Sequence, residues 1–537
     1  MLLHDAALSY LHFIFALILV AALVAEAFRL SDKLIARGHS TAVGFLADGR
    51  MSVRAIGGSP LEILHGGTTI GDTIFLTPHG LTASAVDGAG NAVDTATLWA
   101  NEGGNDDDDD KADGLSGEPW RPQHWDAAAS YPRAAEYGVQ ITGEVSVDMR
   151  RVKARKDDIS GRSNRNVETW LRSARNVEVL QGHARFESPR TVRLDDRQDG
   201  GPNGALLQAD RIFIDVGGRA LVPPMPGLGQ VDYFTNSSIM DVDFLPPHLI
   251  IVGGSYIGLE FGQMYRRFGS QVSIVEQGPR LVSREDADVS QGVLQILENE
   301  GVTVALNAGS MSVEKRGAQI ALRLAGKDGA EERVVSGSHL LLAVGRVPNT
   351  DDLGLDKAGV LTDARGYISV DDQLRTNVPE IWAMGDCNGR GAFTHTSYND
   401  YEIVADNLLN NAARSVEDRI PAYALFIDPP LGRVGMGEAE VRKSGRKALV
   451  GTRPMTRVGR AVEKGETQGF IKIIVDAETH QILGAAILGT GGDEAIHCLM
   501  DAMYAKAAYQ VVQRAVHIHP TVSELLPTVL GELKPLA

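Results

Sequence analysis

The residues best suited to chemistry lie in one short stretch, Gly253-Gly-Ser-Tyr-Ile-Gly258, which follows the apolar run 249–252. Glycine at the start and end of such a turn lets the backbone bend sharply and lets a following helix pack closely on the strand. The first N–H groups of a helix over 259–268 would then face a pyrophosphate. We therefore expect a dinucleotide site formed by Gly253, Gly254, Ser255, Tyr256, Ile257, Gly258 and an acid further on, Glu276.

The acid and the middle of the turn decide which dinucleotide is favoured. Glu276 ends the apolar run 272–275, where it can accept hydrogen bonds from ribose hydroxyls and would repel a 2′-phosphate. Ser255 stands where a glycine is usual, and its Cβ narrows the approach of the phosphates. NAD is favoured, while Arg280 and Arg284 keep NADP open. The alternative is a strand–helix turn that binds no ligand.

Composition limits the class of protein. The 537 residues carry 52 Lys+Arg against 69 Asp+Glu, a net charge of −17, so no nucleic-acid partner is expected. Cys387 and Cys498 are the only cysteines, which excludes a disulfide scaffold and a local redox pair, and no metal site is expected. Strands alternate with helices around the glycine turn, which predicts an α/β fold.

Further motifs follow in a fixed order: 213–220 with 222–227, 342–349, Ile381-Trp-Ala-Met-Gly-Asp386, 427–435 and His517-Ile-His-Pro-Thr-Val-Ser-Glu524. Together with the glycine turn, they resemble the class I pyridine nucleotide-disulfide oxidoreductases. This is the flavoprotein family of glutathione reductase, dihydrolipoamide dehydrogenase and mercuric reductase. The resemblance covers about residues 131–537 and is greatest to its mercuric-reductase-like branch.

The resemblance implies two Rossmann-like domains, the first of them incomplete, and a C-terminal α+β interface domain. It implies FAD and NAD as cofactors, with hydride transfer from NADH to the flavin. Tyr256 and Glu260 match family residues near the nicotinamide. The further cofactor-binding residues that it implies are Gly218, Gly345, Gly385 and Asp386.

The C-terminal motif implies a catalytic dyad of His519 and Glu524, in which the carboxylate orients the imidazole. His517 is the weaker candidate for the imidazole. In the family each such dyad completes the partner's active site, so we expect a homodimer.

Two parts of the family pattern are missing before residue 130. Neither a first FAD fingerprint nor the Cys-x4-Cys redox pair is found there. We favour replacement of this part over a diverged FAD segment. Without the thiols, electrons would leave for quinone, oxygen or another small acceptor. The alternatives are a catalytically impaired nucleotide-binding dimer and a membrane-anchored interaction protein.

The N-terminal third differs in texture from the rest. Residues 6–25 contain no charged side chain and are long enough to cross a bilayer, which would anchor a cytoplasmic catalytic portion to the membrane. The expected segments are a transmembrane helix at 1–30, an unassigned β-rich segment at 31–104, an acidic linker at 105–130, a partial FAD-binding domain at 131–245, an NAD-binding domain at 246–366, a second FAD-binding segment at 367–415 and an interface domain at 416–537.

Overall fold

The computed structural model describes residues 131–536 apart from 144, 175–176 and 326–331. Before residue 131 it describes only the backbone of eight short strands between Ser40 and Trp99. The expected transmembrane helix at 1–30 and linker at 105–130 lie outside the described residues. Within the described residues, no helix is both long and apolar enough to span a membrane.

The chain forms two compact units. Unit 1 comprises Met1–Pro119, Asp157–Arg219 and Val347–Asp418, and unit 2 comprises Trp120–Lys156, Ala220–Arg346 and Arg419–Ala537.

A parallel four-stranded sheet forms the centre of unit 1. Its order is β22 (Ile381–Ala383), β12 (Arg211–Ile214), β5 (Thr73–Thr77) and β8 (Leu98–Trp99). The expected β-rich segment at 31–104 supplies β5, which pairs with β12 from Arg211↔Thr73 to Ile214↔Leu76. The sequence alone assigns this segment no place in the fold, whereas the structure puts β5 inside the sheet.

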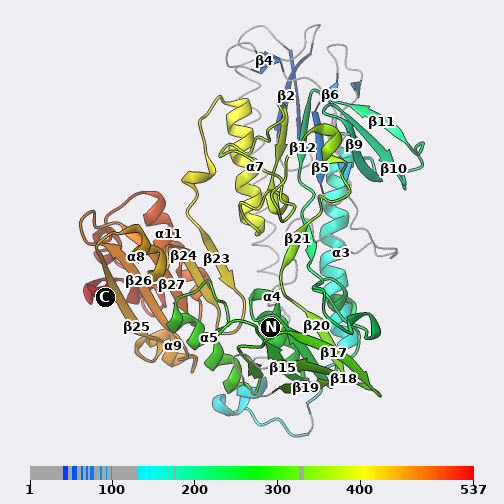
Figure 1. The fold of residues 1–537 in the computed structure, drawn as a ribbon. Helices are drawn as coiled ribbons and strands as arrows, with labels where there is room; N and C mark the ends of the chain where they lie inside the picture. The colour runs from blue at the N-terminus through cyan, green and yellow to red at the C-terminus, as the bar shows by residue number, and fades with distance from the viewer. Residues whose placement is uncertain are drawn as a thin grey trace. The chain divides into compact units, whose positions relative to one another are not determined.

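Helix α7 (Thr394–Leu409) covers one face of this sheet, as Figure 1 shows in yellow. Phe213 of β12 and Trp382 of β22 stack with ring centroids 4.9 Å apart, and Ile403 and Val404 of α7 pack in the same buried cluster. Helix α7 thus contributes to burying the apolar side chains on this face of the strands.

The remaining strands of unit 1 are short. An antiparallel sheet contains β11 (Ala205–Gln208), β10 (Thr191–Asp195) and β9 (His183–Ser188), next to α6 (Leu355–Ala358). The short strands before residue 100 form three antiparallel pairs, β1 (Ser40–Phe45) with β2 (Met51–Ile56), β3 (Glu62–Ile63) with β4 (Thr68–Thr69), and β6 (Ala85–Val86) with β7 (Ala92–Val93). Helix α3 (Met149–Ser173) has residues in both units, and β13 (Gly218–Ala220) pairs with β21 (Arg346–Pro348).

Unit 2 contains a second parallel sheet, in the order β16 (Thr303–Ala305), β15 (Gln271–Val275), β14 (His248–Val252) and β20 (His339–Leu342). Its strands are nearly continuous runs of buried Val, Ile and Leu, as expected for a parallel sheet covered on both faces. Helices α4 (Tyr256–Phe268) and α5 (Ala287–Asn299) belong to it, and β17 (Met311–Arg316), β18 (Gln319–Leu324) and β19 (Arg333–Gly337) form an antiparallel sheet beside it.

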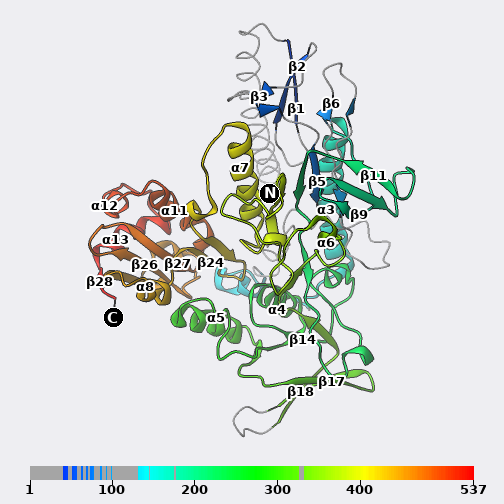
Figure 2. The same cartoon turned by 45° about the horizontal axis from the view of Figure 1, so that its top comes forward.

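The C-terminal part of unit 2 is a six-stranded antiparallel sheet with helices. The strand order is β23 (Ala422–Leu425), β24 (Leu431–Gly435), β27 (Ile482–Leu488), β26 (Phe470–Asp476), β25 (Ala448–Pro454) and β28 (Lys534–Pro535). Its helices are α8 (Glu438–Ser444), α9 (Gly459–Glu463), α10 (Gly492–Ala495), α11 (His497–Tyr504), α12 (Gln510–Gln513) and α13 (Leu526–Gly531). Figure 2 shows α11, α12 and α13 gathered beside β26 and β27.

Alternation along β27 lets this sheet pack on two sides. Ala485 and Ile487 lie in the core shared with α11 and α13, whereas Ala486 and Leu488 lie in the core shared with α5. The dinucleotide-type sheet and the C-terminal sheet of unit 2 therefore share one hydrophobic core.

Candidate active site

The turn between β14 and α4 requires glycine at two positions. Gly253 has a φ of +118°, and a Cβ there would lie 2.2 Å from the carbonyl oxygen of Ala343. A Cβ at Gly258 would lie 2.1 Å from the carbonyl oxygen of Gly253. Both clashes are with backbone, so the sharp turn and the close helix packing depend on these glycines.

The N-terminus of α4 is suited to an anion. Ser255 is exposed and extended, and its side chain makes no capping hydrogen bond to the helix. The first turn contains no acidic residue, while Arg266 and Arg267 lie in the last turn. Ile257 is half-buried against the core. The first-turn N–H groups and the helix dipole therefore give this end a partial positive charge.

Glu276 lies beside the turn, as expected from its position after β15. Its Oε2 accepts a hydrogen bond of 2.8 Å from the N–H of Gly254, and its Oε1 accepts one of 2.6 Å from the N–H of Gly278. The carboxylate is half-buried. The structure thus brings the acid and the turn together.

One face of α4 is fixed by the chain from Tyr423 to Asp428. The ring of Tyr256 meets the ring of Tyr423 edge-on, with centroids 5.6 Å apart. The Oε1 atom of Glu260 accepts a 2.8 Å hydrogen bond from the N–H of Phe426. Tyr256 and Glu260, both expected near the nicotinamide, are therefore held by the C-terminal sheet.

In unit 1, the Gly385–Asp386 turn follows β22. Gly385 has a φ of +67°, and a Cβ there would lie 2.5 Å from Oδ1 of Asp215. Asp400 of α7 is 1% exposed, and its Oδ2 accepts hydrogen bonds from the N–H of Gly385 at 2.9 Å and from the Asn388 side chain at 2.7 Å.

Sequence reasoning missed Asp400 and Asp215. The only available signal for Asp400 was a polar residue in the helix that follows the motif. Asp400 fixes the turn that contains Asp386 through these hydrogen bonds, and Asp215 lies close against Gly385.

The other two expected glycines differ from each other. A Cβ at Gly218 would lie 2.9 Å from the carbonyl oxygen of Val347, so close pairing of β13 with β21 requires this glycine. Gly345 has a φ of +131° but open space around a Cβ. Glycine is therefore favoured at position 345 by the backbone conformation alone.

The expected dyad is in contact. Nδ1 of His519 lies 2.8 Å from Oε2 of Glu524, with the imidazole 79% exposed and the carboxylate 16% exposed. The N–H of Glu524 donates to the hydroxyl of Thr521, which fixes the loop between them. The other face of the imidazole is thus open to solvent, and the neighbouring Ile518 is 79% exposed.

Comparison with known families identifies the protein class. The family model described as pyridine nucleotide-disulphide oxidoreductase matches residues 115–400, more than half of the chain. The model for the dimerisation domain of the same family matches residues 421–530. The chain is a class I pyridine nucleotide-disulfide oxidoreductase. Enzymes of this family bind FAD and NAD(P).

Individual relatives agree with this assignment. The pyridine nucleotide-disulfide oxidoreductase RclA of Escherichia coli is 34% identical over 390 residues, covering 72% of this chain and 86% of RclA. Mercuric reductase of Streptomyces lividans is 33% identical over 400 residues, covering 74% of this chain and 82% of that enzyme. A solved structure of E. coli RclA, described as an HOCl-induced flavoprotein disulfide reductase, aligns with a TM-score of 0.71 at 28% identity, covering 86% of this chain and 99% of that one.

The described residues of this oxidoreductase fit FAD at its second motif. The tight turn at Gly385, with Asp215 and Ser397 against it, leaves room for a backbone but not for a side chain. The parallel strands β22, β12 and β5 end on the same side of the sheet, which is where such folds bind nucleotides. The residues directly after β5 lie outside the described part of the chain.

The two cysteines of this oxidoreductase do not form a redox pair. Cys387 is fully buried, and burial raises the pKa of its thiol well above the ordinary value. Its Sγ lies 3.2 Å from the carbonyl oxygen of Met384. Cys498 is half-buried in α11, with its Sγ 3.8 Å from the hydroxyl of Ser523. Because the thiolate is the reactive form, Cys387 is an inert core residue.

Proposed function

We propose that this enzyme takes a hydride from NADH and passes the electrons, through bound FAD, to a small acceptor that is not a disulfide. The observation that carries the proposal is the turn at Gly253–Gly258, where glycine-dependent geometry, an uncapped helix N-terminus and the Glu276 carboxylate meet. Such a constellation binds the pyrophosphate and one ribose of a dinucleotide.

Glu276 supports NADH over NADPH. Its carboxylate already accepts two backbone hydrogen bonds, which hold it beside the turn. A 2′-phosphate placed there would meet a like charge. Arg280 donates to the carbonyl oxygen of Ser283 and lies after the turn. Its positive charge would therefore offset the repulsion between Glu276 and a 2′-phosphate only weakly.

The flavin half of the proposal rests on the Gly385–Asp386 turn. In this proposal Asp386 would hold sugar hydroxyls of FAD, with Asp400 fixing the turn from α7. Gly218 and Gly345 would let the backbone approach the cofactors closely. The chemistry that bound FAD supplies is acceptance of a hydride and release of its electrons to a second substrate.

The His519–Glu524 pair would manage a proton for the acceptor. Glu524 orients the ring through Nδ1, so Nε2 is the nitrogen left to give or take a proton. Val516 and Ile518 are 100% and 79% exposed on this loop, which favours coverage by a second copy of the chain. The dimerisation domain supports a homodimer in which each dyad serves the partner's flavin.

The acceptor is proposed to be a small molecule such as a quinone or oxygen. Cys387 is buried, Cys498 lies in α11, and both thiols are free. The proposal therefore gives neither cysteine a role in disulfide chemistry. This differs from the disulfide reductase chemistry named for the relative RclA.

The test titrates the purified protein with NADH and, separately, with NADPH under anaerobic conditions. The absorption of the protein in the blue region is monitored during each titration. A flavin band that NADH bleaches more readily than NADPH supports the proposal. The Glu276→Ser variant removes the like charge, and it should narrow the preference for NADH over NADPH. A colourless protein that still binds NADH would instead identify an impaired nucleotide-binding dimer.

A further inference from the structure

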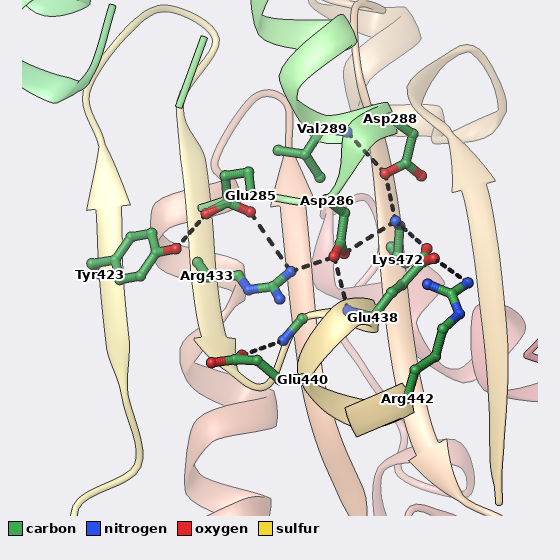
Figure 3. Close-up of polar contacts among 11 residues, drawn as sticks. Glu285, Asp286, Asp288, Val289, Tyr423, Arg433, Glu438, Glu440, Arg442 and Lys472 are labelled. Atoms are coloured by element: carbon green, nitrogen blue, oxygen red, sulfur yellow. Dashed lines mark hydrogen bonds and ion pairs between the residues drawn. The ribbon is translucent and has the colours of Figure 1, made fainter. Parts of the chain in front are cut away.

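A buried polar cluster lies between α5 and the C-terminal sheet (Figure 3). Glu285 precedes α5 and is 2% exposed. It accepts a short hydrogen bond on Oε1 from the hydroxyl of Tyr423, and its Oε2 lies 3.7 Å from the guanidinium of Arg433. This carboxylate therefore connects a tyrosine of β23 to an arginine of β24.

The other end of the cluster is closed by Lys472. Its ammonium is 1% exposed and lies 3.2 Å from Asp286, 2.5 Å from Asp288 and 2.7 Å from Glu438. Since the ammonium already occupies the place where the three carboxylates meet, this end serves as an anchor and not as a metal site. Arg433 joins the anchor to Glu285 through its 3.3 Å contact with Asp286.

Tyr423 carries this anchoring to the dinucleotide turn. Its ring stands edge-on to that of Tyr256, at an interplanar angle of 85°, and the two hydroxyls are hydrogen-bonded. Tyr423 donates its single proton to Glu285, which fixes the orientation of the Tyr423 ring against Tyr256. Burial raises the pKa of Tyr256 to about 12 and raises that of Tyr423 further, so both phenols remain donors.

The position of Tyr256 makes this contact consequential. Tyr256 is the first residue of α4, directly after Ser255, and its N–H belongs to the turn that would face the pyrophosphate. A change in its side-chain position therefore moves the groups that bind the dinucleotide.

We infer that Tyr423 and Glu285 are positioning residues for the dinucleotide site, holding Tyr256 and the first turn of α4 in the binding conformation. The inference rests on the proposed binding of NADH at this turn. Neither residue is part of the glycine motif, and both come from segments distant in sequence.

The test measures NADH binding by titration calorimetry and thermal unfolding of the same preparations. Tyr423→Phe keeps the ring but removes the hydroxyl, and we expect it to raise the Kd for NADH about fivefold. Glu285→Gln keeps an acceptor oxygen for Tyr423, so its effect should be smaller than that of Glu285→Leu. Steady-state assays should show the same change in KM for NADH, with kcat within about twofold of wild type.

Tyr265→Phe is the matched control. Tyr265 lies on the same helix, is 1% exposed and donates to the carbonyl oxygen of Ile239 at 3.2 Å, away from the turn. It should lower the unfolding temperature without changing the Kd for NADH. If the wild type binds NADH and Tyr423→Phe binds it with the same Kd, the inference is overturned but the proposed function is not. If Tyr423→Phe fails to fold, an unchanged Kd in Glu285→Gln and Glu285→Leu overturns it equally. A folded wild type that does not bind NADH overturns both this inference and the proposed function.

Discussion

Gln263 and Asp428 exchange two hydrogen bonds: Nε2 of Gln263 donates to the carbonyl oxygen of Asp428 at 2.8 Å, and the N–H of Asp428 donates to Oε1 of Gln263 at 2.7 Å. The Gln263 side chain is fully buried. The amide of one side chain therefore replaces a strand partner for the chain after β23. This contact fixes the helix that follows the dinucleotide turn to the C-terminal sheet.

Replacing Gln263 by Met should destabilise unit 2 by about 1–3 kcal/mol, because the N–H of Asp428 loses its partner and the Asp428 carbonyl oxygen keeps only the 3.2 Å hydrogen bond from Arg267. Chemical denaturation followed by circular dichroism measures this free energy. Gln295→Met is the control, since Gln295 is exposed and its side-chain amide donates to the exposed Asn299. Equal stability of Gln263→Met and wild type would contradict the assigned role.

Gly258→Ala should weaken NADH binding by about tenfold or more. Its Cβ would meet the carbonyl oxygen of Gly253, so the helix must shift and carry its N–H groups away from the pyrophosphate. Titration of NADH fluorescence gives the affinity. Gly229→Ala, which has nothing within 4 Å of the added Cβ, should bind NADH as wild type does.

His519→Gln should slow turnover with an added acceptor by about 100-fold, because the proton donor is lost. The bleaching of flavin by NADH should remain within about twofold, since the dyad is assigned to the second half of the reaction. Stopped-flow measurements separate the two steps. A similar loss in both steps, or an equal effect from His517→Gln, would argue against the dyad.

Asp199 should make the free energy of unfolding of unit 1 depend on pH in the acid range. Hydrogen bonds from Arg197, and from the N–H groups of Gly201 and Gln181, lower its pKa to about 2 from 3.8. A carboxyl whose pKa is lower in the folded state stabilises the fold above about pH 4, and this stabilisation is lost as the pH falls toward 2.

Asp199→Asn should therefore flatten the fall of the unfolding temperature between about pH 4 and pH 2. The control is Asp210→Asn, which removes an exposed pair with Arg190 and should change that slope little. Identical slopes for the wild type and Asp199→Asn would contradict the assignment.

The dinucleotide unit could be predicted because its constraints are local. Gly253 and Gly258 are required by backbone geometry within a few residues, and the buried strands around them are continuous apolar runs. The His519–Glu524 contact was implied by the family resemblance, and the two residues are only five positions apart.

What could not be predicted depends on pairing between distant segments. Nothing in the residues of β5 indicates that its partner is β12, because parallel register carries no local signal. Glu285, Tyr423 and Gln263 are likewise polar residues whose partners lie far along the chain, and one of those partners is backbone. Burial of such groups follows only from the assembled fold.

The face of α4 that meets the C-terminal sheet has a consequence for chain length. From Tyr256 to Arg267 the helix rises roughly 16 Å. From Tyr423 to Asp428 an extended chain covers about the same distance. The contacts between the two elements therefore occur in the same order along both of them. They are made by Tyr256, Glu260 and Gln263, and by the 2.7 Å ion pair of Arg267 with Asp428. Inserting or deleting a single residue between Tyr423 and Asp428 would put these contacts out of step, so the length of this segment is more tightly constrained than its composition.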